Sequence, residues 1–361
     1  MEWIVATIFK KEGKNLILPR FAKFEPKALS KRQSLILVLL VLVVAVLSIC
    51  GFWWMKNQNI NPAAALTDEK VRGGLPRYLY SIGEDTKPTN LVNSTNTLKG
   101  PLSVAVSTDR VYVADTGHSL VKVYDREGKF VSSWGQGKLN YPFALTYKDD
   151  RLYVADPNLM KVFIFNTEGK EQKALFEKQR LILTNGKEGE LIRPTAVQVG
   201  VDNLIYVADV GNHVILVLDT SGKILNYIGG RGTGDGKFQY PNALFVDKNG
   251  KLYVSDSNNG RIQIFDPNGQ FLYKITGNQG KTGQLTLPRG LVVSDSGVIF
   301  VVDVFLHVVR SFDEAGYELW AFGGQGSGKG QFSFPNGLCL DSEGRIYVTD
   351  RENNRVQVFG Y

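Results

Sequence analysis

The chain has 361 residues, of which 43% are hydrophobic and 21% charged, and its formal net charge is +7. The charge is uneven: residues 1–33 hold eight Lys/Arg against three Asp/Glu, a net of +5, whereas the rest holds 34 basic and 32 acidic residues, a net of +2. A nucleic-acid-binding face needs a surplus of basic side chains to neutralise phosphates. We therefore set nucleic acid aside as a partner of the main part of the chain.

A long apolar run follows the basic segment. Residues 35–50 carry no charge, and residues 51–54 extend the run to about 20 residues, a length that spans a bilayer as a helix. The positive-inside rule places the basic side in the cytoplasm. We predict a cytoplasmic tail (1–33), a transmembrane helix (34–54) and a polar linker (55–75), with the protein held in the cell membrane by a single-pass, N-in anchor.

Cleavage of this segment is the alternative. The small residues at 63–65 resemble a signal-peptidase site, and Cys50 resembles the end of a lipoprotein signal. The basic region is long, however, and the apolar run exceeds the usual core of a signal peptide. Ile49 also stands before Cys50 where a small residue is usual. We therefore expect the segment to be retained, with everything after it on the extracytoplasmic side.

Six repeats fill the chain after residue 100. Each opens with a proline, and 14 or 15 residues later an aspartate closes an apolar strand; the prolines are Pro101, Pro142, Pro194, Pro241, Pro288 and Pro335, and the aspartates are Asp115, Asp156, Asp209, Asp256, Asp303 and Asp350. A fixed period of 40–50 residues with several short strands is typical of a β-propeller with one repeat per blade. We predict an all-β, six-bladed β-propeller over residues 76–361.

The fourth repeat shows the blade pattern. Apolar or alternating stretches at 241–247, 251–256, 261–266 and 271–275 are separated by glycine- and asparagine-rich turns, which predicts four antiparallel strands. The sixth repeat ends without its outer strand. Residues 77–83 match the outer strands of other repeats, so we expect this N-terminal strand to complete the sixth blade and close the ring.

These residues resemble the NHL repeat. The resemblance rests on Tyr206 to His213, on Tyr347 to Phe359 and on the glycine-rich loops 229–238 and 323–332. It covers residues 77–361 and implies a six-bladed propeller. The family includes enzymes, RNA-binding modules and protein-interaction modules, so the resemblance implies no particular reaction.

The six repeated aspartates resemble a carboxylate array that could bind a ligand. Because one occurs in every repeat, we expect each to cap a turn by accepting backbone N–H groups. No nucleophile–base pair stands out, and no nucleophile elbow is visible in the sequence.

Three histidines carry an alternative hypothesis. His118, His213 and His307 lie in repeats one, three and five, three or four residues after the aspartate. Alternate blades of a six-fold ring are about 120° apart, so three inward imidazoles would form a zinc site. The loop at 303–309 also resembles a histidine loop of the peptide-amidating lyases. The residues that follow the opening prolines are not histidines, in contrast to those enzymes, and the alternative is that His213 and His307 belong to the repeat consensus.

Two repeats differ from the others at the turn after the aspartate. Phe305 and Leu306 in the fifth repeat, and Leu159 and Met160 in the second, replace polar turn residues. Exposed apolar turns mark contact surfaces, whereas covered ones are part of a core. The insertion at 178–193 offers such a cover, and both interpretations stay open. Arg193 and Arg289, beside opening prolines, are expected on the same face, where they attract an acidic partner.

The leading hypothesis is a non-enzymatic binding or scaffolding module that presents a propeller face to a protein or glycan outside the membrane. No cofactor is expected for it. The alternative is a metal-dependent lyase or hydrolase at the channel mouth, with zinc or calcium as its metal. The two differ in one requirement, because the enzyme needs His118, His213 and His307 to converge.

Overall fold

The structure, a computed structural model, describes residues 75–84, 96–278 and 282–361. The predicted tail (1–33) and transmembrane helix (34–54) lie outside these residues, as does the linker (55–75) up to residue 74. In the part of the chain that is described, no helix has the length and apolarity needed to cross a bilayer.

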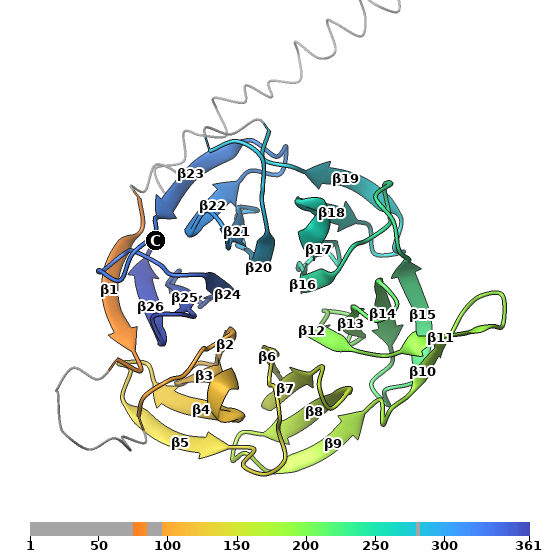
Figure 1. The fold of residues 1–361 in the computed structure, drawn as a ribbon, viewed down its shortest axis with the longest axis horizontal. Coiled ribbons are helices and arrows are strands. Elements are labelled where there is room, and N and C mark those ends of the chain that lie inside the picture. Colours follow the sequence, from red (N-terminus) through yellow and green to blue (C-terminus); the bar gives the residue numbers. More distant parts are fainter. Residues whose placement is uncertain (1–74, 85–95, 279–281) are drawn as a thin grey trace, which may run out of the picture. The chain divides into compact units, whose positions relative to one another are not determined.

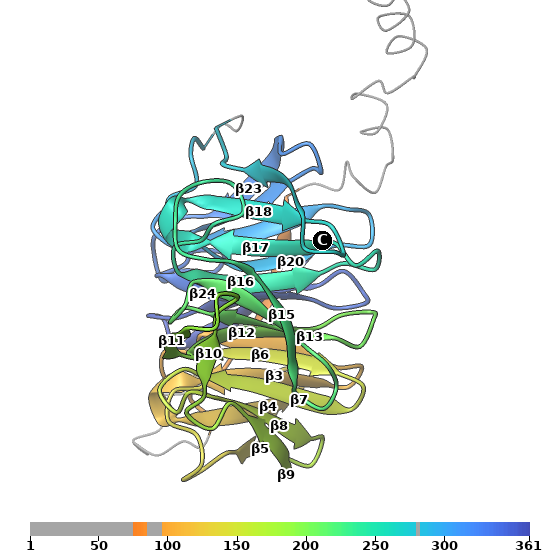
Figure 2. The same ribbon diagram turned by 90° about the vertical axis from the view of Figure 1, so that its right-hand side faces the viewer.

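Six four-stranded antiparallel sheets surround a central axis, so the described residues form a six-bladed β-propeller (Figure 1). Figure 2 shows the ring from the side. The innermost strand of blades 2 to 6 starts at or just after the opening proline, and the second strand of every blade ends at the repeated aspartate. The predicted period therefore corresponds to one blade.

Blades 1 to 3 have the following strands, from the innermost outwards. Blade 1 contains β2 (Ser103–Val106), β3 (Arg110–Asp115), β4 (Leu120–Asp125) and β5 (Phe130–Trp134), with a 3-10 turn η2 (Thr116–His118); blade 2 contains β6 (Ala144–Lys148), β7 (Arg151–Asp156), β8 (Lys161–Asn166) and β9 (Glu171–Leu175); blade 3 contains β12 (Pro194–Val199), β13 (Ile205–Asp209), β14 (Val214–Leu218) and β15 (Ile224–Gly229).

Blades 4 to 6 follow the same order. Blade 4 contains β16 (Pro241–Val246), β17 (Leu252–Asp256), β18 (Arg261–Phe265) and β19 (Phe271–Ile275), with a 3-10 turn η3 (Ser257–Asn259); blade 5 contains β20 (Pro288–Val293), β21 (Ile299–Asp303), β22 (Val308–Phe312) and β23 (Glu318–Gly323); blade 6 contains β24 (Pro335–Leu340), β25 (Ile346–Asp350), β26 (Arg355–Gly360) and β1 (Arg77–Ile82). The four strands predicted for the fourth repeat are confirmed within a residue or two.

The hydrophobic core is divided among the blade interfaces. Six clusters of buried residues occur, and each joins two neighbouring blades. One cluster joins blade 1 to blade 2 through Tyr112, Trp134 and Leu152, for example. Side chains of successive strand residues point to opposite faces of a sheet, so every blade packs against both of its neighbours.

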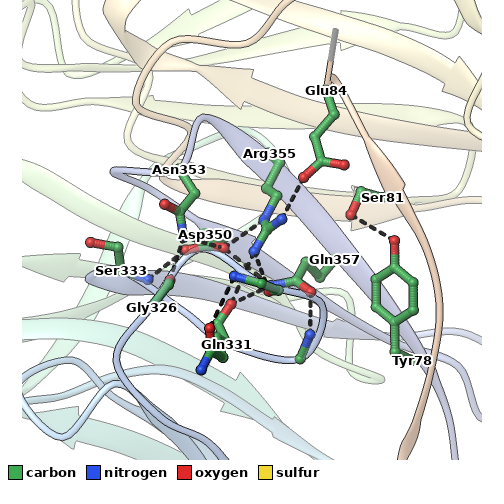
Figure 3. Close-up of polar contacts among 12 residues, drawn as sticks. Tyr78, Ser81, Glu84, Gly326, Gln331, Ser333, Asp350, Asn353, Arg355 and Gln357 are labelled. Carbon is green, nitrogen blue, oxygen red and sulfur yellow. Dashed lines mark hydrogen bonds and ion pairs between the residues drawn. The ribbon is translucent and has the colours of Figure 1, made fainter. Parts of the chain in front are cut away.

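The N-terminal strand closes the ring, as predicted. β1 pairs with β26 in antiparallel register, with Ile82 opposite Val356. Ile82 is fully buried and belongs to the cluster that joins blade 6 to blade 1. Beyond the strand, the Glu84 carboxylate accepts a hydrogen bond from Arg355, whose Nε also donates to Asp350 (Figure 3). The last blade is thus completed by the first strand of the domain.

The insertion at 178–193 forms a hairpin of β10 (Arg180–Ile182) and β11 (Glu188–Leu191) at the rim of blade 3 (Figure 1). Leu181 is buried in the cluster between blades 2 and 3. The Tyr227 hydroxyl accepts a hydrogen bond from the Thr184 N–H. The hairpin is therefore part of the outer wall of the ring near blades 2 and 3.

Candidate functional site: the top face of the propeller

One face of the ring carries every candidate site residue. We call it the top face; it consists of the turns between the second and third strands and of the loops that enter each blade. The opening proline of a blade lies opposite its aspartate in the register, as Pro194 lies opposite Asp209. Both therefore mark the same end of the blade.

The six aspartates cap the entering loops. All six are fully buried. Each accepts, at 2.7–2.9 Å, a backbone N–H from the loop that enters its own blade; the donors are Lys99, Asn140, Arg193, Gln239, Thr286 and Ser333. The carboxylates are used to hold backbone groups, as their recurrence in every repeat indicates. The expected capping role is confirmed.

The residue four positions after each aspartate adopts a left-handed conformation. The six equivalent residues have φ of 54–60° and are Ser119, Met160, His213, Gly260, His307 and Asn354. In four of them, Ser119, His213, His307 and Asn354, the side chain forms a hydrogen bond with the loop that enters the next blade. The Asn354 Oδ1 accepts the Gly100 N–H at 2.8 Å. A Cβ on Gly260 would lie 2.7 Å from the Leu285 carbonyl oxygen, so this turn requires glycine.

His213 and His307 occupy this position, four residues after the aspartate, in blades 3 and 5; we call it the latch position. The His213 Nδ1 accepts the Tyr240 N–H at 3.1 Å, and the His307 Nδ1 accepts the Phe334 N–H at 3.0 Å. Each imidazole also lies edge-on to the ring of that aromatic residue. Both histidines are buried. They fasten one blade to the entrance of the next.

His118 has a different neighbour. It follows Asp115 in the 3-10 turn, and its Nδ1 lies 2.8 Å from the Asp115 Oδ2. Within residues 75–84, 96–278 and 282–361, no three histidine, cysteine, aspartate or glutamate side chains gather closely enough to share a metal ion. The structure therefore does not bring His118, His213 and His307 together, as the zinc site of the alternative hypothesis requires.

We expect His213 to make the stability of the domain depend on pH. Burial, followed by the nearby charge of Arg231, lowers the pKa of His213 below its ordinary value of 6.5. A lowered pKa in the folded state stabilises the fold above the ordinary value, and this stabilisation is lost as the pH falls through the folded-state pKa. The free energy of unfolding should therefore decrease from pH 7 towards pH 5.

Substitution His213→Asn isolates this contribution. Asparagine tolerates the left-handed conformation, and Asn354 accepts the equivalent hydrogen bond in blade 6. Urea unfolding at pH 7 and pH 5 should show a smaller loss of stability in the variant than in the wild type. Burial raises the pKa of Asp209, which acts in the opposite direction, but this contribution is common to both proteins. Equal losses would show that His213 does not titrate in this range.

The apolar turn residues differ in exposure. Phe305 is 59% exposed, whereas Leu306, Leu159 and Met160 are only partly exposed. Leu159 packs against the cluster between blades 1 and 2. The hairpin of residues 178–193 leaves Phe305 uncovered, so the covering hypothesis does not hold for blade 5.

Two further exposed aromatic residues share the top face with Phe305. Tyr240 and Phe334, each just before an opening proline, are 46% and 37% exposed. Both have positive φ, at 53° and 50°, and both are fastened by the latch histidines. Neither residue was predicted from the sequence, although the position just before the opening proline, which they share, is a signal that points to them.

The two predicted arginines lie in different surroundings. Arg193 is exposed in the loop that enters blade 3. Arg289 lies in the channel mouth, which we define as the residues that follow the opening prolines around the central channel: Leu102, Phe143, Asn242, Arg289 and Asn336. The channel has a volume of about 230 Å³ and continues between the innermost strands of the blades.

Comparison with known proteins agrees with this architecture. Residues 98–124, 238–265 and 332–359, in blades 1, 4 and 6, match the NHL repeat. Comparison with curated proteins gives no match.

Several solved structures are similar. Virginiamycin B lyase from Staphylococcus aureus is 14% identical, with a TM-score of 0.52 over 75% of this chain and 98% of that chain. An auxiliary nutrient binding protein from Bacteroides thetaiotaomicron is 15% identical, with a TM-score of 0.56 over 73% and 69%. Hydrazine synthase from Kuenenia stuttgartiensis is 17% identical, with a TM-score of 0.50 over 75% and 80%. Identities this low establish the shared fold alone. The chain is therefore a six-bladed β-propeller that contains NHL repeats.

Proposed function

We propose that this protein is a binding or scaffolding module whose top face holds a protein or glycan partner outside the membrane. In this proposal, residues 34–54 anchor the chain and residues 1–33 stay in the cytoplasm. Attachment confines the propeller to two dimensions and raises its local concentration near membrane partners. The uncharged run at 35–50 after a basic segment supports the anchor.

The observation that carries the proposal is the set of exposed aromatic residues on one face. Phe305, Tyr240 and Phe334 belong to blades 5, 4 and 6 or to the loops entering them, and all are more than one-third exposed. Phenylalanine and tyrosine are enriched at binding interfaces because they remove large apolar areas from water at low entropic cost. Latching of Tyr240 and Phe334 by buried histidines fixes their backbone in advance, which reduces the cost of binding.

Among the structurally similar proteins are a nutrient-binding protein and a lyase. The fold thus serves both binding and catalysis elsewhere, and the choice depends on the face itself. On the described part of the top face the six repeat aspartates are occupied as caps, and His213 and His307 are occupied by the next entering loops. The aromatic residues remain available to a partner, which favours binding.

The double substitution Phe305→Ser/Leu306→Ser tests the proposal. We expect recovery of the partner to fall about tenfold or more, because removal of an aromatic contact residue often costs 2 kcal/mol or more, which corresponds to about a thirtyfold loss of affinity. The tagged full-length protein is cross-linked in intact cells with a membrane-impermeant, amine-reactive reagent, and the adducts are quantified by mass spectrometry.

A matched control is available on the outer strands. Leu225 and Leu272 are 52% and 45% exposed and lie on β15 and β19, away from the top face. Leu225→Ser/Leu272→Ser should leave recovery unchanged. Equal recovery with both double variants would reject blade 5 as the contact. Adducts that form only with a membrane-permeant reagent would reject the extracytoplasmic location.

A further inference from the structure

Arg289 reaches across the central channel. It belongs to β20, and Figure 1 shows β20 and β6 on opposite sides of the centre of the ring. Its guanidinium carbon nevertheless lies 5.8 Å from the ring centroid of Phe143, the residue just before β6. This is within the range of a cation–π contact. The guanidinium therefore stands in the channel mouth, at the top of the channel.

Arg289 has no charged partner, in contrast to the buried arginines of the blades. Arg261, Arg310 and Arg355 each form an ion pair with the aspartate of their own blade. Arg289 makes no side-chain hydrogen bond or ion pair with any of the residues described, and its Nε is buried without a partner. Burial, followed by the nearby charge of Arg351, lowers the pKa of Arg289. A buried donor without an acceptor is costly, so this arrangement calls for an explanation.

A second free donor lies beside it. Asn336 lines the channel, is 7% exposed and makes no side-chain hydrogen bond to the residues that the structure describes. It follows the opening proline of blade 6, as Arg289 follows that of blade 5. Gly290 allows the two strands to approach, because a Cβ there would lie 2.6 Å from the Asn336 carbonyl oxygen. A guanidinium and an amide thus face the same small space from neighbouring blades.

Below these donors the channel runs between the innermost strands of the blades. Its lining is mixed, with polar residues such as Thr146 and Gln198 beside apolar ones such as Leu145, and its volume of about 230 Å³ suits a small organic group. The site therefore combines one unpaired positive charge, one amide and a small space with a mixed polar and apolar lining. A phosphate carries up to two negative charges and three strong acceptor oxygens, whereas one guanidinium neutralises a single charge and the amide only adds a hydrogen-bond donor. A carboxylate matches both the single charge and the planar donor fork of arginine.

We propose that the channel mouth is a carboxylate-binding site, in which Arg289 and Asn336 hold the carboxylate of a ligand and the channel below accepts the group that carries it. The carboxylate belongs either to a free small acid or to an acidic side chain of a polypeptide. In the second case this inference rests on the proposed function and names the chemistry of the partner. The negative charge of the ligand carboxylate then acts as the counter-ion that Arg289 lacks within the described chain.

Calorimetric titration of the full-length protein tests the site with two matched pairs of probes. The first pair is 3-phenylpropanoate and its neutral amide, which represents a free acid. The second is N-acetylglutamate N-methylamide and its glutamine counterpart, which represents a side chain. We expect at least one carboxylate to bind about tenfold more tightly than its neutral match, since charged hydrogen bonds are the stronger ones. Which pair shows the difference identifies the source of the carboxylate.

Variants assign the binding to these residues. Arg289→Gln should reduce carboxylate affinity by about tenfold or more, and Asn336→Leu should reduce it less. Arg180→Gln, which removes an exposed arginine of the β10–β11 hairpin, should change nothing. Carboxylates that bind no better than their neutral matches, or binding that survives Arg289→Gln, would overturn the proposal. If the wild-type protein shows no preference for carboxylates while Phe305→Ser/Leu306→Ser loses its partner, this inference alone is refuted. If carboxylates bind as expected while Phe305→Ser/Leu306→Ser keeps its partner, the proposed function alone is refuted.

Thermal unfolding without ligand gives an independent readout. If Arg289 is a binding residue, Arg289→Met removes an unpaired charge from a partly buried site and raises the melting temperature, by about 2 °C for a domain of this size. Stability gained with loss of function is the usual signature of a binding residue. A purely structural role through the contact with Phe143 would give the opposite sign. A lowered melting temperature with unchanged carboxylate binding would contradict the assignment.

Discussion

Deletion of residues 77–84 from the full-length chain is expected to lower the melting temperature by about 10 °C or more. β1 supplies the fourth strand of blade 6, and without it β26 becomes an open edge. The deletion also removes Ile82 from the cluster between blades 6 and 1, and Glu84 from Arg355. Because every blade depends on both neighbours, loss at one interface opens the ring.

Point substitutions separate packing from chain length in this experiment. Ile82→Ala should reduce the free energy of unfolding by about 2–5 kcal/mol, because Ile82 is fully buried. Leu79→Ser, on the same strand but 46% exposed, should change it by less than about 0.5 kcal/mol. Differential scanning calorimetry of the three variants provides the measurement. A deletion variant that melts like the wild type would show that β1 is an appendage of a ring closed by other contacts.

The blade pattern could be predicted from the sequence because each blade is a local unit. The spacing from opening proline to aspartate determines the first hairpin, and the outer strand is recognisable by its alternation. Even the long-range pairing of β1 with β26 was predictable, since residues 77–83 match the strand that the sixth repeat lacks. In both cases the other repeats of the chain serve as the reference with which a segment is compared.

The candidate site was predictable only in part. Arg289 and Phe143 lie in blades on opposite sides of the ring, and their contact depends on the width of the channel, which no local pattern encodes. The prediction that His118, His213 and His307 converge assumed that equivalent turns point inward. The side chains of His213 and His307 point instead to the next entering loop, because the left-handed turn directs them along the ring. Phe305 was recognisable because an apolar residue in an exposed turn departs from the repeat.

The second large effect is expected from Arg355, the buried arginine of blade 6. Its Nε donates to Asp350 at 2.7 Å, and its Nη2 donates to the carbonyl oxygens of Gly328 and Gln331 (Figure 3). Asp350 is fully buried and Arg355 is 4% exposed. Arg355→Met leaves this aspartate without its charged partner, which typically costs 3–5 kcal/mol. We expect a loss of about this size in urea unfolding at pH 7.

A double variant shows whether the unpaired charge is the cause. Asp350→Asn keeps an oxygen that accepts the Ser333 N–H but removes the negative charge, so Arg355→Met/Asp350→Asn should be more stable than Arg355→Met alone. Arg351→Met is the matched control. Arg351 is exposed and pairs with Glu352 at 3.2 Å, and surface ion pairs of this kind contribute about 0–1 kcal/mol. If the loss of stability in the double variant equalled the sum of the losses in the two single variants, the charge of Asp350 would not be the cause. The cost would then lie in lost packing and in the lost bonds to the Gly328 and Gln331 carbonyls. If the double variant regains stability, the loss in Arg355→Met comes from the uncompensated charge of Asp350. The capping aspartate of blade 6 then requires a charged partner.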